Sequence, residues 1–516
     1  MSGASAPAVG DDAAGHQRGL LSITAHQWLV LLTIQTSTLL FGMTITIANV
    51  VLPQMRGALS ATQDEISWVI TFNLVATAVA TPMSGWLANR LGWRPLMLGT
   101  LTGFIVMSFL CGIATSLESL ILFRVCQGIF GAPIMPIGQA ILLASFPRHM
   151  HATVMVMWGV GAVFGPVFGP IFGSLIADMY DWRTAFFMII PPGCVAIVCT
   201  WFALPRQTEN TASRFDWTGF IALSIAITGL QLLMDRGQRL DWFESTEIVL
   251  CATAAAVAFW IFAVHCLTTD NPFLDPRLLL DRNFSVGTLI AFVLGMLSYI
   301  SLALFPSLLH DLRGYPDSAI GLLLAGRGVG NWFAFLVIVP FSRVSARGAV
   351  AFGLAAQALS ALAMAQLDIN LTGFDVFTLN MVQGFGFGLA FTPLMVLSFS
   401  TLPRHHINEG SAVFTLVRNF GSSIFISITV VLLVRSTASN YARLTEQIMP
   451  YNKVIQHPGL PEAWDPGTIG GLARLSREIL RQASMIGYIN GFYLVAAVAA
   501  AGLPLVLLLR GMPRND

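Results

Sequence analysis

The sequence is poor in charge: charged residues make up 10% of its 516 positions, and Lys453 is the single lysine. A phosphate-binding loop needs a lysine followed by serine or threonine, and Lys453 is followed by Val454, so ATP hydrolysis by this chain is not expected. A net charge of +1 argues against nucleic acid as a partner. The low charge therefore points away from ATP-driven and nucleic-acid-binding proteins.

Cysteine is also scarce, and histidine clusters with acids are missing. The six cysteines all fall in apolar segments, where they act as small packing residues: Cys111, Cys126, Cys194, Cys199, Cys251 and Cys266. His149 with His151, and His405 with His406, stand in short loops without cysteine or carboxylate clusters. We therefore predict no disulfide, no metal site and no cofactor. No nucleophile and base pair up inside an apolar segment, so the chain is not predicted to be an enzyme.

Apolar residues are abundant: they form 55% of the chain, with 36 Phe and a mean hydropathy of +0.73. A soluble domain could not bury that much apolar surface. Fourteen apolar segments follow one another, each long enough to cross a hydrocarbon core of about 30 Å as a helix. They lie near 28–51, 68–87, 95–114, 120–145, 153–177, 184–204, 218–234, 247–267, 285–309, 319–339, 349–367, 376–400, 411–434 and 486–509. The sequence predicts an all-α integral membrane protein.

An even number of spans places both chain ends on one side of the membrane. If that side is the cytoplasm, short inner loops and tails hold thirteen arginines and short outer loops hold five, as the positive-inside rule requires. The first 27 residues lack the apolar core and cleavage site of a signal peptide, so we expect a cytoplasmic tail. Both termini are predicted to be cytoplasmic.

Arg124 lies within the apolar segment 120–145, whereas no Asp or Glu falls midway through any such segment. A charge at that depth costs about 2.5–3.5 kcal/mol, so it is normally kept for a transport pathway or a pairing role. Gln127 lies three residues further on and shares the helix face of Arg124. Arg327 and Arg418 also lie within apolar segments, where pathway roles and snorkelling to an interface are both open. The chain is predicted to be a membrane transporter.

The fifth apolar segment carries glycine at every fourth position. Gly161, Gly165, Gly169 and Gly173 form a stripe along one helix face, which lets another backbone approach closely. Pro166 and Pro170 remove amide donors and are expected to bend the helix. A bent and tightly packed helix can serve as a hinge. The run 384–388, which has glycine at every second position, is interpreted as close helix packing.

Several motifs together resemble one family. The segment 161–173 resembles the antiporter motif of the major facilitator superfamily. The other stretches that fit in order are 46–53, 85–94, 124–128, 215–219, 234–237, 240–243 and 418–422. Over about residues 28–510 the chain resembles the fourteen-helix EmrB-type drug:proton antiporters. The resemblance implies two six-helix bundles that rock about a central site, with two extra helices between them.

The resemblance also implies a division of the chain into parts. These are a tail (1–27), an N-terminal bundle (28–204), two linker helices with their loops (205–284), a C-terminal bundle (285–509) and a second tail (510–516). The C-terminal bundle includes an outer segment, 435–484, in which 441–448 and 472–486 are predicted to be short amphipathic helices. EmrB-type pumps lie in the inner membrane and pass hydrophobic compounds to a periplasmic adaptor connected to an outer-membrane channel. The outer segment is accordingly either a solvated loop or the adaptor surface.

Further residues are assigned through the resemblance. Gly128 completes the Arg-x-x-Gln-Gly motif that begins at Arg124, and Asn49 belongs to the first-span motif. The inner loop motif supplies Gly85, Asn89, Arg90, Gly92 and Arg94. Arg90 and Arg94 would hydrogen-bond carbonyls or acids at neighbouring helix ends and latch one conformation, or only anchor the loop on the positive side.

The chain departs from the family pattern at two positions. Thr44 stands where many relatives carry a first-span Asp, and Asn89 stands where Asp is commonest in the loop motif. Threonine cannot carry a proton at physiological pH, so the proton gradient expected as energy source has no obvious carrier. Of the acids at span ends, which include Asp216, Asp235 and Asp311, we single out Asp178, because it closes the glycine-rich helix. A solvated loop acid is the alternative.

Buried arginines without acids give an electrostatic preference for anionic or neutral cargo. The sequence thus predicts a multidrug efflux transporter of the inner membrane that exports hydrophobic, anionic or neutral compounds by proton antiport as part of a tripartite pump. The alternative is a dedicated exporter of one metabolite or siderophore with the same fold and no adaptor.

Overall fold

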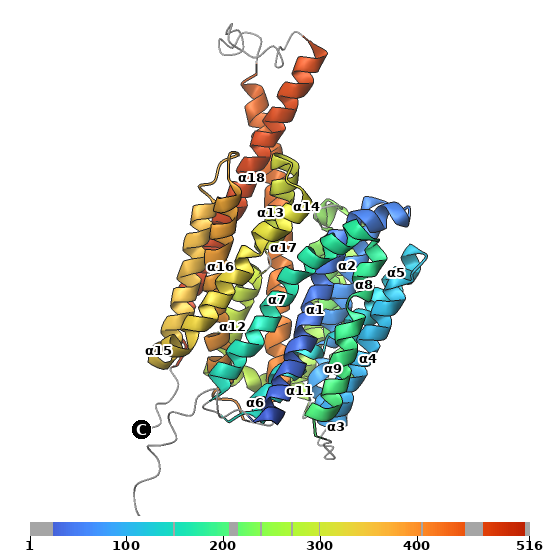
Figure 1. The fold of residues 1–516 in the computed structure, drawn as a ribbon, viewed down its shortest axis with the longest axis vertical. Coiled ribbons are helices and arrows are strands. Elements are labelled where there is room, and N and C mark those ends of the chain that lie inside the picture. The colour runs from blue at the N-terminus through green and yellow to red at the C-terminus, as the bar shows by residue number, and fades with distance from the viewer. Residues whose placement is uncertain are drawn as a thin grey trace, which may run out of the picture.

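The structure, a computed structural model, describes residues 24–147, 150–205, 215–237, 240–269, 272–298, 300–403, 406–448 and 468–510. Helices are the only regular elements in those ranges (Figure 1). Thirteen of them are long and apolar enough to cross a membrane, and the bent pair Glu65–Ala80 and Met83–Leu91, which meet at 54°, gives up to 14. Each apolar segment predicted from the sequence falls on one of these spans. The predicted all-α membrane fold is confirmed.

The first six spans form the N-terminal half. Its helices are α1 (Ala25–Ala58), α2 (Gln63–Ala80), α3 (Met83–Leu91), α4 (Trp93–Gly112), α5 (Leu117–Gly131), α6 (Ile134–Ser145), α7 (His151–Met179), α8 (Trp182–Phe187) and α9 (Ile190–Ala203). Pro82 separates α2 from α3, and Pro133 separates α5 from α6, because proline lacks the amide hydrogen that a continuous helix needs. Capping boxes at Thr62 and Ser116 fix where α2 and α5 begin.

Two extra spans follow, α10 (Trp217–Arg236) and α11 (Thr246–Thr268). The 3₁₀ turn η4 (Trp242–Glu244) lies between them, and η5 (Pro276–Leu280) comes after α11. The last six spans form the C-terminal half. Its helices are α12 (Arg282–Ser298), α13 (Ile300–Ser307), η6 (Leu308–Leu312), α14 (Asp317–Leu324), α15 (Gly326–Met364), α16 (Gly373–Phe399), α17 (Ile407–Glu446) and α18 (Ile469–Val506). Ser345 has non-helical backbone angles and divides α15 into two spans.

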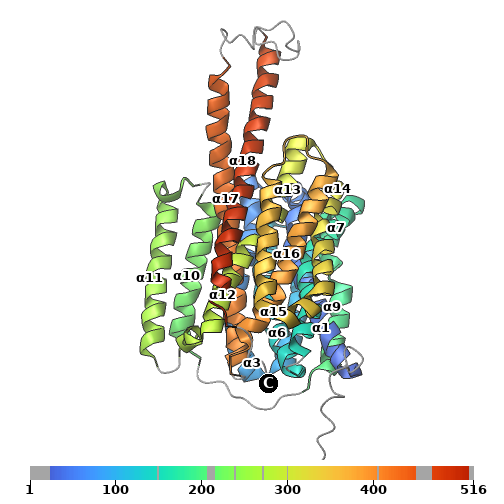
Figure 2. The same cartoon turned by 90° about the vertical axis from the view of Figure 1, so that its left-hand side faces the viewer.

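The outer segment differs from its prediction. Residues 441–446 are the end of α17, and 472–486 lie inside α18, so neither stretch is a separate short helix. The two helices project beyond the rest of the bundle as an antiparallel pair (Figures 1 and 2). The hydroxyl groups of Tyr441 and Ser476 lie 2.9 Å apart, and Asn490 Nδ2 donates to Ser436 Oγ at 2.7 Å. The helices continue because leucine, arginine and glutamate are good helix formers, and no proline or glycine interrupts either stretch.

The two ends of the bundle are distinct. The start of α1 and the end of α18 lie at one end, called here the terminal end, and the α17–α18 projection marks the opposite, hairpin end (Figure 1). Most of the predicted tails, 1–23 and 511–516, together with Arg148, His149, Arg404 and His405, lies outside the described residues.

Helices α10 and α11 lie side by side at one side of the bundle (Figure 2). Helix α10 contacts both halves. Thr71 of α2 donates a hydrogen bond to Asp235 of α10, and Gln231 of α10 donates to Ser423 of α17. Gln231 and Asp235 are four residues apart and share one helix face. The extra helices are therefore attached to both halves through the same face of α10.

Candidate functional site

The glycine stripe of α7 packs against α1. A Cβ atom on Gly165 would lie 2.5 Å from the carbonyl oxygen of Leu39, and one on Gly169 would lie 2.8 Å from that of Met43. At Gly161 a Cβ atom would lie 2.9 Å from the backbone oxygen of Gln35, whereas at Gly173 the nearest atom, Cγ1 of Ile47, would lie 3.4 Å away. Helix α7 is continuous through Pro166 and Pro170. The close backbone approach that the stripe predicts is present, and the hinge stays a prediction.

Arg124 is buried inside the N-terminal half, where 1% of its surface is exposed. Its Nη1 donates to Gln127 Oε1 at 2.7 Å, and its Nε donates to the carbonyl oxygen of Val69 on α2 at 3.4 Å. Gln127 Nε2 in turn donates to Ser108 Oγ of α4 at 2.6 Å. The guanidinium lies 5.9 Å from the ring centre of Phe186 on α8. The side chain therefore joins three spans through neutral oxygens, and no carboxylate of the described residues forms an ion pair with it.

Asn73 of α2 completes this cluster. Its Nδ2 donates to the backbone oxygen of Arg124 at 2.7 Å. Gly128 lies against the same residue, since a Cβ atom there would lie 2.6 Å from the Asn73 carbonyl oxygen. Gly128 is thus needed for the close contact between α5 and α2, and Asn73 fixes how the two helices are aligned.

A second buried arginine occupies the C-terminal half. Arg327, which is 3% exposed, donates from Nη1 to Gln383 Oε1 of α16 at 3.2 Å and from Nη2 to the Leu297 oxygen of α12 at 3.4 Å. Ser301 of α13 also donates to Gln383 Oε1. The guanidinium lies 5.5 Å from the ring centre of Phe387. Arg327 is therefore held within the bundle and does not snorkel to an interface.

Arg418 of α17 lies at the contact between the two halves. Its Nη2 lies 3.5 Å from Met135 Sδ of α6 and 3.1 Å from Asn419 Oδ1, and its guanidinium lies 5.3 Å from the ring centre of Phe391. Arg124, Arg327 and Arg418 thus occupy three different places, one in each half and one between the halves.

The predicted latch residues lie on α3 and at its junction with α4. Gly92 has a φ of +81°, a backbone conformation that favours glycine, and it separates the two helices. The guanidinium of Arg90 lies 5.2 Å from the ring centre of Trp86, and that of Arg94 lies 4.4 Å from the ring centre of Trp201 on α9. Gly85 is buried and Asn89 is half-buried. The two arginines contact rings where we expected carbonyls or acids, and the latch itself stays a prediction.

The remaining predicted residues are dispersed. Thr44 is buried and donates to the Leu40 oxygen at 2.9 Å, while Asn49 is exposed. Asp178 lies in the last turn of α7, and its side chain is outside the part of the chain that the structure describes. Among the described residues, no three side chains of His, Cys, Asp or Glu come together as metal ligands would.

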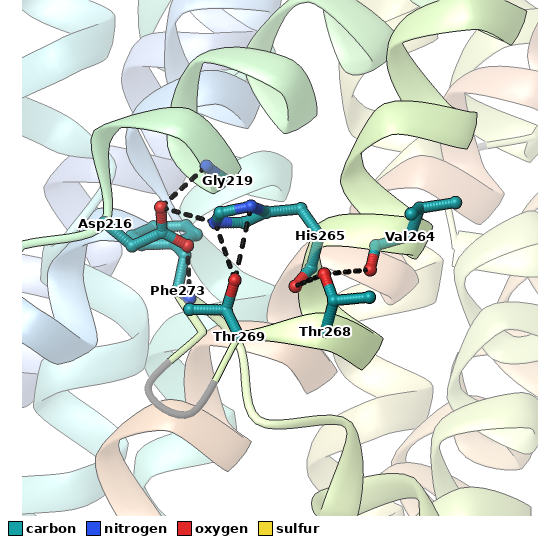
Figure 3. Close-up of polar contacts among 7 residues, drawn as sticks. All are labelled: Asp216, Gly219, Val264, His265, Thr268, Thr269 and Phe273. Carbon is teal, nitrogen blue, oxygen red and sulfur yellow. Dashed lines mark hydrogen bonds and ion pairs between the residues drawn. The ribbon is translucent and has the colours of Figure 1, made fainter.

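Asp216, one of the acids at span ends, accepts several hydrogen bonds (Figure 3). It accepts hydrogen bonds from the backbone amides of Gly219 at 2.9 Å and Phe273 at 3.0 Å. Its Oδ1 also lies 2.9 Å from Nε2 of His265, which comes from α11. Asp216 therefore caps α10 and ties it to α11 and to the segment that leads to α12.

Sequence reasoning missed Asn73, Ser108, Ser301 and Gln383 as partners of the buried arginines. The available signal was that each is a polar residue inside an apolar segment. That signal alone did not show which polar residues face one another, because each pair joins different spans.

Comparisons with known proteins agree with this architecture. Residues 36–426 match the model of the Major Facilitator Superfamily. The chain is 34% identical over 433 residues to the multidrug export protein EmrB of Escherichia coli K12, covering 82% of this chain and 84% of that one. It is 33% identical over 491 residues to the EmrB protein of Haemophilus influenzae (93% and 95% covered). It is 31% identical over 448 residues to the fatty acid resistance protein FarB of Neisseria gonorrhoeae, and the match covers 86% of each chain.

The fold also resembles a solved structure. A bacterial homologue of the human lysosomal transporter Spinster, crystallised in an inward-facing and unoccupied conformation, superposes with a TM-score of 0.53 at 16% identity. The likeness covers 94% of this chain and 98% of that one. At this identity it supports the fold alone.

Proposed function

Since this chain belongs to the major facilitator superfamily, as an efflux transporter related to EmrB and FarB, we propose that it exports hydrophobic anionic or neutral compounds by proton antiport. It would act in the inner membrane of a bacterium, with the terminal end of the bundle in the cytoplasm and the hairpin end outside. We further propose that it passes its cargo to a periplasmic adaptor joined to an outer-membrane channel.

The observation that supports the charge preference is the environment of Arg124. Its guanidinium is almost fully buried and hydrogen-bonds to the neutral oxygens of Gln127 and Val69. A cation in low dielectric without a paired anion attracts negative charge and repels other cations. The named activity of FarB supports the same preference, because a fatty acid is a hydrophobic anion.

The test is export by reconstituted protein. Proteoliposomes with an imposed proton gradient would be loaded with a fluorescent fatty acid, a neutral dye and a quaternary ammonium dye of similar size. We expect gradient-dependent movement of the first two and little of the third. Faster movement of the quaternary ammonium dye than of the fatty acid contradicts the charge preference, and movement that ignores the gradient contradicts antiport.

The proton carrier that we propose is Asp178, at the end of the glycine-rich helix α7. Thr44 cannot take this role, because its hydroxyl does not ionise at physiological pH. Asp178→Asn is expected to abolish gradient-driven export while exchange of cargo across the membrane continues. Full gradient-driven export by this variant excludes Asp178.

The proposed adaptor surface is the projecting pair formed by the ends of α17 and α18. It extends beyond the rest of the bundle at the hairpin end, and Tyr441 and Ser476 join its two helices (Figure 1). Deletion of 445–475 is expected to abolish co-purification of the adaptor and drug resistance in cells, while export by proteoliposomes continues. Co-purification and resistance at wild-type levels after the deletion contradict this surface.

A further inference from the structure

The two halves hold their buried arginines at glutamines in equivalent positions. Gln127 and Gln383 each lie eleven residues beyond the N-cap of their helix, Ser116 and Thr372, and each is followed by a glycine. Each glutamine accepts a hydrogen bond from a buried guanidinium: Gln127 at 2.7 Å and Gln383 at 3.2 Å. These positions correspond in the two halves.

The helix that supplies the guanidinium differs between the halves. Gly128 packs against the carbonyl oxygen of Asn73, and Gly384 packs against that of Arg327, so Asn73 and Arg327 are equivalent. Both also lie eleven residues beyond an N-cap near the start of their membrane span, Thr62 of α2 and Pro316 of α14; Arg327 itself lies on α15, which continues the span of α14.

The residues three positions before each glutamine also differ between the halves. Arg124 lies three residues before Gln127, and Asn380 lies three residues before Gln383. The N-terminal half therefore has Asn73 and Arg124 where the C-terminal half has Arg327 and Asn380. Arginine and asparagine have changed places, and the glutamine is kept.

We propose that export of anionic cargo needs one guanidinium hydrogen-bonded to the glutamine of each half, and that either of the two neighbouring helices can supply it. Gln383 is then the positioning residue for the charge of the C-terminal half, as Gln127 is in the N-terminal half. This inference rests on the proposed export of anionic compounds.

The position of Asn380 is compatible with the exchange. Its Cβ atom lies on the same face of α16 as that of Gln383, as three-residue spacing requires. Its side chain is fully buried, and its Oδ1 has no hydrogen-bond partner among the described residues. Gln383 Nε2 is likewise buried and unpaired within the described part of the chain. Buried amide groups normally have hydrogen-bond partners. Asn380 and Gln383 therefore each have an amide atom that could form a further hydrogen bond.

The test is a charge exchange within one half. The variants are Arg327→Asn, Asn380→Arg and the double variant that combines them, measured by export of a fatty acid and of a neutral dye from proteoliposomes. Arg327→Asn is expected to lower fatty acid export about tenfold or more, the loss that one hydrogen bond to a charged group represents. The double variant should restore export to within about threefold of wild type. The guanidinium at position 380 would again bond to Gln383, and the asparagine at position 327 would face the backbone oxygen of residue 380, as Asn73 faces that of Arg124.

A purely structural role predicts a different pattern. If Arg327 only stabilises the bundle, both cargoes fall equally in Arg327→Asn, and that result overturns the proposal. The proposal instead predicts that the ratio of fatty acid export to neutral dye export falls in Arg327→Asn and recovers in the double variant. A folded double variant as impaired as Arg327→Asn also overturns it. If Arg327→Asn fails to fold, recovery of folding and export in the double variant supports the exchange, and failure to recover contradicts it.

The reciprocal exchange, Asn73→Arg with Arg124→Asn, repeats the test in the other half. Export by the wild-type protein tests the proposed function separately from the exchange. If wild type exports only cationic compounds, the proposed cargo class is wrong, and the exchange is scored with the cargo that wild type exports.

Discussion

Ser411 of α17 donates a hydrogen bond to Oε1 of Gln139 on α6 at 2.9 Å, joining the two halves at the terminal end. Both side chains are fully buried, and the Ser411 hydroxyl also lies 3.0 Å from the backbone oxygen of Pro136. Any motion that opens this end of the transporter must separate the pair.

Ser411→Ala is therefore expected to favour the conformation that is open at the terminal end. Loss of about 1 kcal/mol shifts the ratio of the two conformations about fivefold. The measurement is the distance distribution between spin labels at two exposed positions, Leu91 at the end of α3 in one half and Leu507 just after α18 in the other, in a background without native cysteines. Ser360→Ala is the control, since Ser360 bonds to Leu379 within one half. An unchanged distribution in Ser411→Ala contradicts the prediction.

The glycine stripe of α7 predicts a graded series of alanine variants. Gly165→Ala places a methyl group 2.5 Å from the Leu39 oxygen, so α1 and α7 must separate. We expect a destabilisation of about 1–3 kcal/mol and a matching loss of export. At Gly173 the nearest atom lies 3.4 Å away, an ordinary contact, so Gly173→Ala should behave as wild type. Thermal unfolding in detergent measures both, and equal effects at the two positions would show that the stripe is not a packing surface.

Gln127→Glu tests the charge of Arg124 without changing the shape of the site. A carboxylate at this position would pair with the guanidinium and cancel its field. Fatty acid export should fall about tenfold or more, while neutral dye export changes little. Gln366→Glu makes the same chemical change at an exposed site and serves as the control. Fatty acid export at the wild-type rate in Gln127→Glu means that the charge of Arg124 does not select cargo.

Removal of the Asp216 carboxylate should loosen α10 and α11. Asp216→Ala removes an N-cap, a bond to the Phe273 amide and the contact with His265 (Figure 3). The expected cost is about 1–3 kcal/mol, seen as a lower midpoint of thermal unfolding in detergent. The exposed Glu118, in the first turn of α5, gives a control for loss of an acid by Glu118→Ala. Equal midpoints for the two variants would show that the network adds nothing.

The sequence alone determined the spans, because hydropathy is a local property that adds up along about 20 residues and needs no knowledge of neighbours. It also identified Arg124 as exceptional, since a charge at that depth is costly wherever the helix packs. The close contact of α7 with another backbone followed from glycine spacing, but its partner α1 did not. Helices at 441–448 and 472–486 were predicted, but not that they continue the last two spans as a projecting pair, because the apolar pattern that marks a span ends where these polar residues begin.

Only the tertiary structure decided which polar side chains meet. Arg327 and Gln383 belong to different helices, and so do Gln127 and Ser108. The contact between two helices depends on how each is rotated and aligned against the other, and a local pattern of apolar residues does not fix that rotation. The exchange of arginine and asparagine between the halves became visible for this reason, once glycines at equivalent positions had shown which residues of the two halves correspond.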